Sequence, residues 1–284
     1  MCTTDECDEG RRTFLTTTAA AIVGVAASNI AAQQTPKYPH NEKVVTRVLD
    51  DPTISHGPVM FQHNKTDTMD GFLARPKADG KYPVVIVIAG NVITEEYIPN
   101  TCAALAVAGY VGLAPNIFHP LTPVAQTPEE RRKATIGHSD SDALLDINAG
   151  LDYLRKQSFA SFDSIGVVGF CYGGKLALML GSRSREIDAV VAYHPGPVTD
   201  EEIARLQVPV IIHQGTADHS LPEGQTAALV KRLKVRKIPL QDYWYEGADH
   251  GFLAYTRPFY KPDYAKLSWE RTIAFLDRYL KSKK

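Results

Sequence analysis

The hexapeptide Gly169–Gly174 constrains the fold of this chain more than any other stretch. Its sequence, Gly-Phe-Cys-Tyr-Gly-Gly, follows the apolar run Ser164–Phe170 and precedes a helix-like segment, Lys175–Gly181. This order predicts a sharp strand-to-helix turn that presents Cys171 as a nucleophile. Glycine on both sides allows so tight a turn because it has no Cβ to clash, and the following helix N-terminus favours a thiolate. The alternative is a buried cysteine in a Gly-rich turn.

An acid and then a histidine follow the nucleophile in the order that such a turn requires. The run Val208–Gly215 predicts a strand, with Asp218 in the loop after it, and Leu240–Tyr245 predicts another strand, followed by His250. Sites of open α/β sheets form at the carboxyl ends of strands. We therefore expect Cys171, His250 and Asp218 to converge as nucleophile, base and orienting acid. A helix cap at Asp218 and a turn role for His250 are the alternatives.

Four motifs of the chain resemble the dienelactone hydrolase family, and the similarity spans roughly residues 55–284. They are Gly169–Gly174, Gly215-Thr-Ala-Asp218, Tyr245–Phe252 and Gly109–Pro115. The resemblance implies an α/β-hydrolase fold, with a mostly parallel twisted sheet and helices on both faces of a single domain. It also implies a cofactor-free hydrolase of small carboxylic esters or lactones that uses a Cys-His-Asp triad and an acyl-enzyme. The family's namesake opens the lactone ring of dienelactones.

The same resemblance suggests further residues of the site. The backbone N–H groups of Tyr172 and Val92 are expected to form the oxyanion hole. Asn91 stands where the family has a glutamate that helps to activate the thiol. Glu95 and Glu96 follow in the same loop; they either replace that glutamate or are surface charges at the start of a helix.

Two arginines hold a substrate carboxylate in the family, and their counterparts here are incomplete. Arg131 is a candidate for the first; Ala254 occupies the position of the second, and Arg257 lies nearby in the sequence. These departures leave the prediction of a hydrolase intact but put the dienelactone substrate in doubt. The expected partner is therefore a small-molecule ester or lactone, and the sequence leaves the oligomeric state open.

Other polar residues near predicted strand ends carry weaker signals. His119 and His194 each follow a strand, where they either line the site or have solvated or capping roles. The segment His138–Asp142 has the composition of hard-metal ligands, but we expect it to cap the next helix. The sequence contains no phosphate loop, nucleotide fingerprint or zinc signature, so neither a cofactor nor a metal is predicted.

Strands and helices alternate along the rest of the chain, which predicts a mostly parallel sheet with helices on both faces. The β-branched run 81–90 is typical of a strand buried on both faces. The chain has 284 residues and a net charge of −1, which suits one large domain and gives no sign of a nucleic-acid partner. Helices are expected at 97–108, 140–156, near 224–233 and at 265–280, and a hairpin from 59–61 and 71–74.

Residues 1–32 are predicted to be a twin-arginine export signal. Arg11-Arg-Thr-Phe-Leu15 precedes the mildly apolar run 16–27 and then Ala31-Ala32, although acidic residues lie before the arginines. The run is too short to span a bilayer, so stable membrane insertion is not expected. Residues 33–54 are predicted to be an irregular lead-in. The protein is thus expected to be periplasmic or secreted.

Two other functions remain compatible with these patterns. One is a thioesterase or peptidase-like hydrolase on the same fold, and the other is a non-catalytic periplasmic binding or thiol protein. The absence of a C-x-x-C pair argues against dithiol exchange. Cys102, in an apolar helix, is expected to lie in the core.

Overall fold

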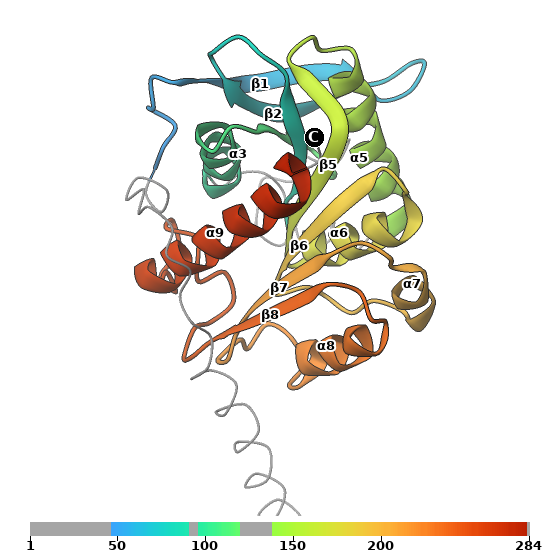
Figure 1. Ribbon diagram of the computed structural model, residues 1–284, viewed down its shortest axis with the longest axis vertical. Helices are drawn as coiled ribbons and strands as arrows, with labels where there is room; N and C mark the ends of the chain where they lie inside the picture. Colours follow the sequence, from blue (N-terminus) through green and yellow to red (C-terminus); the bar gives the residue numbers. More distant parts are fainter. Residues whose placement is uncertain (1–46, 91–95, 120–137, 283–284) are drawn as a thin grey trace, which may run out of the picture. The chain divides into compact units, whose positions relative to one another are not determined.

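An eight-stranded sheet organises the computed structural model, which describes residues 47–90, 96–119 and 138–282 (Figure 1). The strand order is β1-β2-β4-β3-β5-β6-β7-β8, in which β2 runs antiparallel to β1 and β4 and all other neighbours are parallel. The strands are β1 (Ile54–Gln62), β2 (Thr68–Pro76), β3 (Tyr82–Ile88), β4 (Val111–Pro115), β5 (Ala160–Phe170), β6 (Ile187–Tyr193), β7 (Val210–Gly215) and β8 (Leu240–Tyr245). The helices are α3 (Tyr97–Val107), α5 (Asp140–Arg155), α6 (Tyr172–Arg183), α7 (Asp200–Arg205), α8 (Gln225–Val235) and α9 (Pro262–Leu276), which continues as the π-helical turn η2 (Asp277–Lys281).

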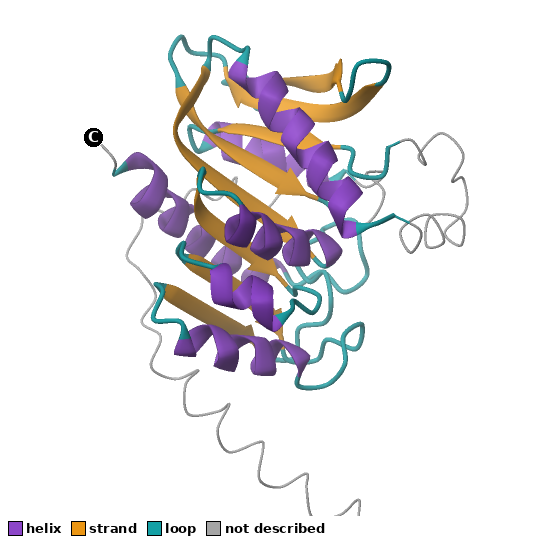
Figure 2. Cartoon of the chain, turned by 90° about the vertical axis from the view of Figure 1, so that its right-hand side faces the viewer, coloured by secondary structure: helices purple, strands orange, loops and turns teal. Residues whose placement is uncertain are grey.

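Helices cover both faces of the sheet and bury a separate core on each (Figure 2). On one face the core is formed with α3 and α9, and on the other it is formed with α5, α6, α7 and α8. The central strand β3 contributes to both, since Val85 and Val87 belong to the first core and Val84, Ile86 and Ile88 to the second. All five side chains are fully buried, which confirms the prediction for this β-branched run. The α/β-hydrolase fold expected from the sequence is therefore present.

The parallel strands end together at one edge of the sheet. Phe170 of β5 pairs with Tyr193 of β6, and Gly215 of β7 pairs with Tyr245 of β8. Side chains in the loops after these four strands are consequently brought to a single edge, as open α/β sheets require of a site.

The structure departs from the sequence-based expectations in several elements. The hairpin strands are longer than predicted, since β1 and β2 pair over nine residues each. The six-residue helix α7, capped by Thr199, was not predicted, because one and a half turns carry too little periodicity to detect. The expected helix 265–280 begins earlier and ends as the π-helical turn η2.

Part of the expected irregular lead-in, residues 33–54, packs onto the domain. Val48 is buried, and its backbone N–H donates to Oδ1 of Asn100 in α3 at 2.6 Å. The strand β1 already begins at Ile54. The predicted export signal, residues 1–32, lies outside the described residues. No helix within the described ranges combines the length and apolar character needed to cross a membrane.

Candidate active site

The predicted strand-to-helix turn is present, with Cys171 between β5 and α6. Cys171 has φ 56° and ψ −116°, a positive-φ conformation that non-glycine residues seldom adopt and that costs on the order of 1–3 kcal/mol. A Cβ at Gly169 would lie 2.0 Å from the carbonyl oxygen of Gly173, and one at Gly173 would lie 2.2 Å from the carbonyl oxygen of Ile88. Glycine is therefore required at both positions by close backbone approach, as the sequence predicted.

The end of β3 also lies against the nucleophile. A Cβ at Gly90 would lie 2.7 Å from Cβ of Cys171 and from the carbonyl oxygen of Phe170. The loop that follows Gly90 therefore begins beside the thiol, but the expected residues Asn91, Val92 and Glu95 lie outside the described residues. Of the expected oxyanion donors, Tyr172 is described; it is the first residue of α6, where backbone N–H groups have no intrahelical acceptor.

His250 and Asp218 come together from the loops after β8 and β7. Nδ1 of His250 lies 2.9 Å from Oδ2 of Asp218. The Asp218 carboxylate also accepts hydrogen bonds from Nε2 of Gln214 and from the backbone N–H of Ser220, both at 2.9 Å. Thr226 Oγ1 in turn donates to Gln214 Oε1 at 2.9 Å. The carboxylate is thus held in one orientation by a chain of buried polar groups.

These contacts make His250 an unusually basic imidazole. Burial disfavours its charged form, but hydrogen bonds and charge interactions with Asp218 and Cys171 outweigh burial and raise its pKa to about 9. Burial likewise acts to raise the pKa of Asp218, and the bonds from His250 and Gln214 overcome it and hold that pKa below its usual range. Both directions favour an imidazolium–carboxylate pair beside the thiol.

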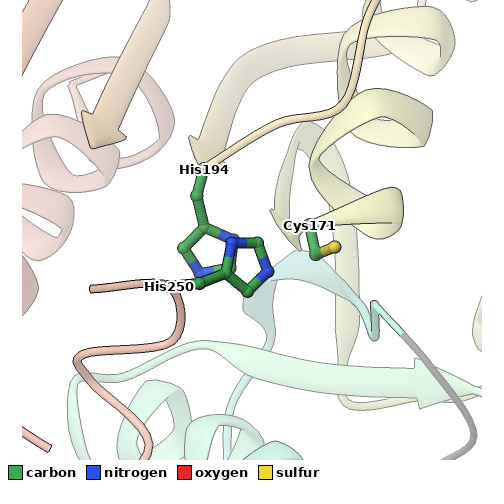
Figure 3. Close-up of side chains that lie close together, drawn as sticks. All are labelled: Cys171, His194 and His250. Carbon is green, nitrogen blue, oxygen red and sulfur yellow. The ribbon is translucent and has the colours of Figure 1, made fainter. Parts of the chain in front are cut away.

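A second histidine lies in the same cluster, shown in Figure 3. The ring centroid of His194, directly after β6, is 4.0 Å from that of His250. His194 is buried with φ 37°, and neither ring nitrogen has a hydrogen-bond partner among the described residues. Burial, and the nearby charge of His250, lower its pKa well below the ordinary value, so this ring stays neutral. Of the sequence alternatives for His194, pocket lining is the one that the structure places here.

The thiol and the two imidazoles border a small pocket. One ligand atom from each residue, Sγ of Cys171 and a ring nitrogen of each histidine, lies within 4.8 Å of the other two. This spacing would also allow the three atoms to bind a soft divalent metal ion. The pocket is lined by Gly90, Tyr97, Phe170, Cys171, His194, His250, Gly251, Leu253, Ala254 and Arg257. The candidate substrate-binding residue Arg257 is therefore brought to the nucleophile, and Ala254 lies beside it. The other candidate, Arg131, lies outside the described residues.

Glu96 does not face the thiol. It precedes α3 as its N-cap residue, and its carboxylate accepts from Nε of Arg47 at 2.8 Å and from the hydroxyl of Tyr255 at 2.7 Å. This matches the alternative of a charge at a helix start. Ser139 likewise caps α5 by accepting from the backbone N–H of Asp142 at 3.1 Å, as expected for that segment.

The second cysteine of the described residues differs sharply from Cys171. Cys102 lies within α3, is fully buried and belongs to a hydrophobic core, as the sequence predicted. Burial raises the pKa of its thiol, so it remains protonated and inaccessible.

Known proteins resemble this chain over most of its length. The model of the dienelactone hydrolase family matches residues 69–280. A probable 2-oxo-3-(5-oxofuran-2-ylidene)propanoate lactonase from Bradyrhizobium is 29% identical over 75% of this chain and 90% of its own length. A carboxymethylenebutenolidase from Pseudomonas putida is 26% identical over 72% of this chain and 90% of its own length. A solved dienelactone hydrolase-type structure from Klebsiella pneumoniae superposes with a TM-score of 0.72 at 24% identity, covering 80% of this chain and 99% of that one. The chain belongs to the dienelactone hydrolase family, within the α/β-hydrolase superfamily, and is a hydrolase that acts on ester bonds.

Proposed function

We propose that this protein hydrolyses small carboxylic esters or lactones through a Cys171–His250–Asp218 triad and an acyl-enzyme, without a cofactor. One observation carries the proposal: a basic His250 lies 2.9 Å from the Asp218 carboxylate and has a ring nitrogen within 4.8 Å of the thiol presented at the strand-to-helix turn. The family supplies the class of reaction, and the Bradyrhizobium relative is a probable lactonase. The triad assigns that reaction to particular atoms of this chain.

In the acylation step, the thiolate of Cys171 attacks the ester carbonyl carbon and forms a tetrahedral oxyanion. The N–H of Tyr172 at the start of α6 donates to this oxyanion, and a donor from the loop after Gly90 is the expected second. As the carbon–oxygen bond breaks, the His250 imidazolium gives its Nε2 proton to the leaving alkoxide. In a lactone, that alkoxide stays attached to the acyl group, and the ring opens.

Deacylation returns the protein to its starting state. The now neutral His250 takes a proton from a water molecule, whose oxygen attacks the thioester carbon. The carbon–sulfur bond then breaks and releases the carboxylic acid and the Cys171 thiolate. Asp218 accepts from Nδ1–H throughout, which keeps Nε2 facing the reaction and stabilises the imidazolium.

The pocket favours a small, anionic substrate. Its apolar side is formed by Tyr97, Phe170 and Leu253, and Arg257 supplies a cation beside the nucleophile. A guanidinium pairs with a carboxylate through two parallel hydrogen bonds. We therefore place Arg257 as the group that orients a substrate carboxylate, with Asn91 and Arg131 as further candidates from the sequence.

A panel of esters, lactones, thioesters and peptides tests this function. The purified protein should hydrolyse small esters or lactones fastest, and Cys171→Ala should abolish that activity, since it removes the attacking atom. Cys102→Ala is the matched control, because it removes a thiol that is buried in the core. Faster hydrolysis of thioesters or peptides would favour the alternative hydrolase, and equal activity of Cys171→Ala would reject the triad.

We also propose that the twin-arginine motif exports the protein, so that it works in the periplasm or outside the cell. The support is the sequence of residues 1–32, with paired arginines ahead of a short, mildly apolar run.

A further inference from the structure

A second cluster of histidine and aspartate side chains lies apart from the residues that line the Cys171 pocket. His63 and Asp67 belong to the connection between β1 and β2, and His119 follows β4. Nε2 of His119 lies 2.9 Å from Oδ2 of Asp67, and Nδ1 of His63 lies 3.7 Å from the same oxygen. One ligand atom from each of the three residues lies within 4.8 Å of the other two. Three side chains from two segments, 52 residues apart, thus present donor atoms to one point.

The backbone holds these three residues in place. The N–H of His63 donates to the carbonyl of Asp67 at 3.0 Å and closes the hairpin. The turn that carries His119 is fixed to β2, because Asn116 donates from its backbone and from its side chain to Asp70. The donor atoms are therefore positioned by hydrogen bonds that leave the ligand atoms of the three side chains unused.

A buried carboxylate behind the cluster provides an independent observation. The side chain of Asp146, on α5, is 2% exposed, and its Oδ1 lies 3.0 Å from Nε2 of His63. Its Oδ2 faces Nε2 of His138 at 3.3 Å but has no hydrogen-bond partner among the described residues. An imidazole that gives one ring N–H to a carboxylate while its other nitrogen faces outward is the arrangement typical of metal-bound histidine.

The Asp146 carboxyl favours one tautomer of His63. With the ring proton on Nε2, 3.0 Å from Oδ1 of Asp146, the lone pair of His63 lies on Nδ1, the atom that faces Asp67. The side-chain amide of Asn64 lies 3.3 Å from that atom, which is consistent with Nδ1 as an acceptor. Asn64 is exposed, so a ligand at Nδ1 would displace a solvent-facing group only.

We propose that Nδ1 of His63, Oδ2 of Asp67 and Nε2 of His119 bind one zinc ion, with Asp146 holding His63 in the binding tautomer. Two imidazoles and one carboxylate form a common zinc donor set, and the side chain of Asp67 is 43% exposed, which leaves a fourth position open to water. Tetrahedral zinc with bonds of 2.0–2.2 Å separates its ligand atoms by about 3.4 Å. The separation of 2.9 Å is about 0.5 Å shorter than this value, and the separation of 3.7 Å is about 0.3 Å longer.

Zinc binding would replace a hydrogen bond. Nε2 of His119 and Oδ2 of Asp67 lie within hydrogen-bond distance of each other in the metal-free state. Zinc needs the lone pair of Nε2, so the ring proton of a neutral His119 moves to Nδ1 and the hydrogen bond to Asp67 is lost. The ion would then fasten the β1–β2 connection to the end of β4. It takes no part in the proposed ester hydrolysis.

Calorimetric titration of the chelator-treated full-length protein with zinc chloride tests the proposal. The protein should bind a zinc equivalent that is absent from Asp67→Asn and His119→Gln, and this binding should raise its Tm. Asp146→Asn should retain the site with affinity lowered about 10-fold, because it weakens the support of His63. His56→Gln is the matched control, since it changes an exposed imidazole of β1 outside the cluster.

A further variant distinguishes zinc bound at this cluster from zinc bound by Cys171, His194 and His250. Cys171→Ala should keep the equivalent that depends on Asp67 and His119, and cobalt bound there should lack a thiolate absorption band. The proposal is overturned if no zinc binds, or if Asp67→Asn and His119→Gln bind it as tightly as the unaltered protein. It is overturned equally if Cys171→Ala alone removes the ion. The side chain of Asp67 is partly exposed, at 43%, and Asn is close to Asp in size, so Asp67→Asn keeps the test valid even if a histidine variant fails to fold.

Discussion

At the scale of single residues, the proposed chemistry depends on how His250 is held between two partners. Asp218 fixes Nδ1, and this leaves Nε2 for the thiol and the substrate. The order of Cys171, Asp218 and His250 along the chain was enough to predict this pair, because each follows a recognisable strand. Gln214 and Thr226, which hold the carboxylate, could not be predicted, since their hydrogen bonds join side chains from a strand and a helix whose packing the local sequence does not specify.

The raised pKa of His250 predicts a pH-dependent contribution to stability. Its folded pKa of about 9 exceeds the unfolded value of about 6.5, so the stabilisation is fully present below about pH 6.5 and is lost as pH rises through about 9. The difference corresponds to about 3 kcal/mol. Urea unfolding near pH 6 should give His250→Gln a lower free energy of unfolding than the unaltered protein. This difference in unfolding free energy should become about 3 kcal/mol smaller near pH 10. A gap that stays constant across this range would contradict the pKa.

His194 is predicted to act through His250 as a positioning residue. Its neutral ring packs on the His250 ring at 4.0 Å and limits the rotation of that imidazole. His194→Asn, which tolerates the positive φ, should lower kcat about 10-fold with a smaller effect on KM, because misplacement of a base is felt mainly in the chemical step. Steady-state kinetics on the best ester of the panel measure both constants. An unchanged kcat would show that the contact is only packing.

At the scale of elements, the strand-to-helix turn is the feature that the sequence specifies most strongly. Glycines on both sides of a nucleophile indicate that backbone segments approach closely there. A Cβ at Gly169 or at Gly173 would lie only 2.0 or 2.2 Å from a carbonyl oxygen, which explains both glycines.

The cluster at the β1–β2 connection could not be predicted in the same way. His63, Asp67, His119 and Asp146 are scattered over 84 positions and converge only when β2 pairs with β4 and α5 packs beside them. No local spacing motif could reveal that cluster.

Replacing a glycine of the turn should unfold the protein or destabilise it severely. A Cβ at Gly169 would meet the carbonyl oxygen of Gly173 at 2.0 Å, so the backbone must shift, at a cost of about 3 kcal/mol or more. The matched control is Gly57→Ala in β1, where a Cβ would meet nothing within 4 Å and stability should be nearly unchanged. Thermal unfolding of Gly169→Ala and Gly57→Ala gives the two Tm values to compare. Equal Tm values would show that the turn tolerates a side chain.

At the scale of the whole molecule, two cores on opposite faces of one sheet hold the site edge in position. Cys171, His194, Asp218 and His250 all follow strands whose ends are aligned by parallel pairing, so their spacing depends on the sheet rather than on the loops alone. Sequence periodicity predicted this sheet because its central strands are continuous apolar runs. It could not predict the packing of Val48 onto α3, which combines burial of the Val48 side chain in the core with a hydrogen bond from its N–H to Asn100.

The export proposal belongs to the same scale, because it concerns the fate of the entire chain. Residues 1–40 fused to a folded reporter should carry it to the periplasm, since the twin-arginine route transports folded proteins. Changing both Arg11 and Arg12 to Lys should retain the reporter in the cytoplasm. Cell fractionation measures the distribution, and unchanged export of the double variant would reject the twin-arginine assignment.

The central claim is that Cys171 forms the acyl-enzyme, and peptide mass spectrometry tests it most directly. The protein is mixed with a slowly deacylating small ester, quenched in acid within the first turnover, digested and analysed for the acyl mass. The acyl group should appear on the peptide that contains Cys171, and not on those that contain Cys2, Cys7 or Cys102. Labelling of another residue, or unlabelled Cys171 in a protein that still hydrolyses the ester, would contradict the claim.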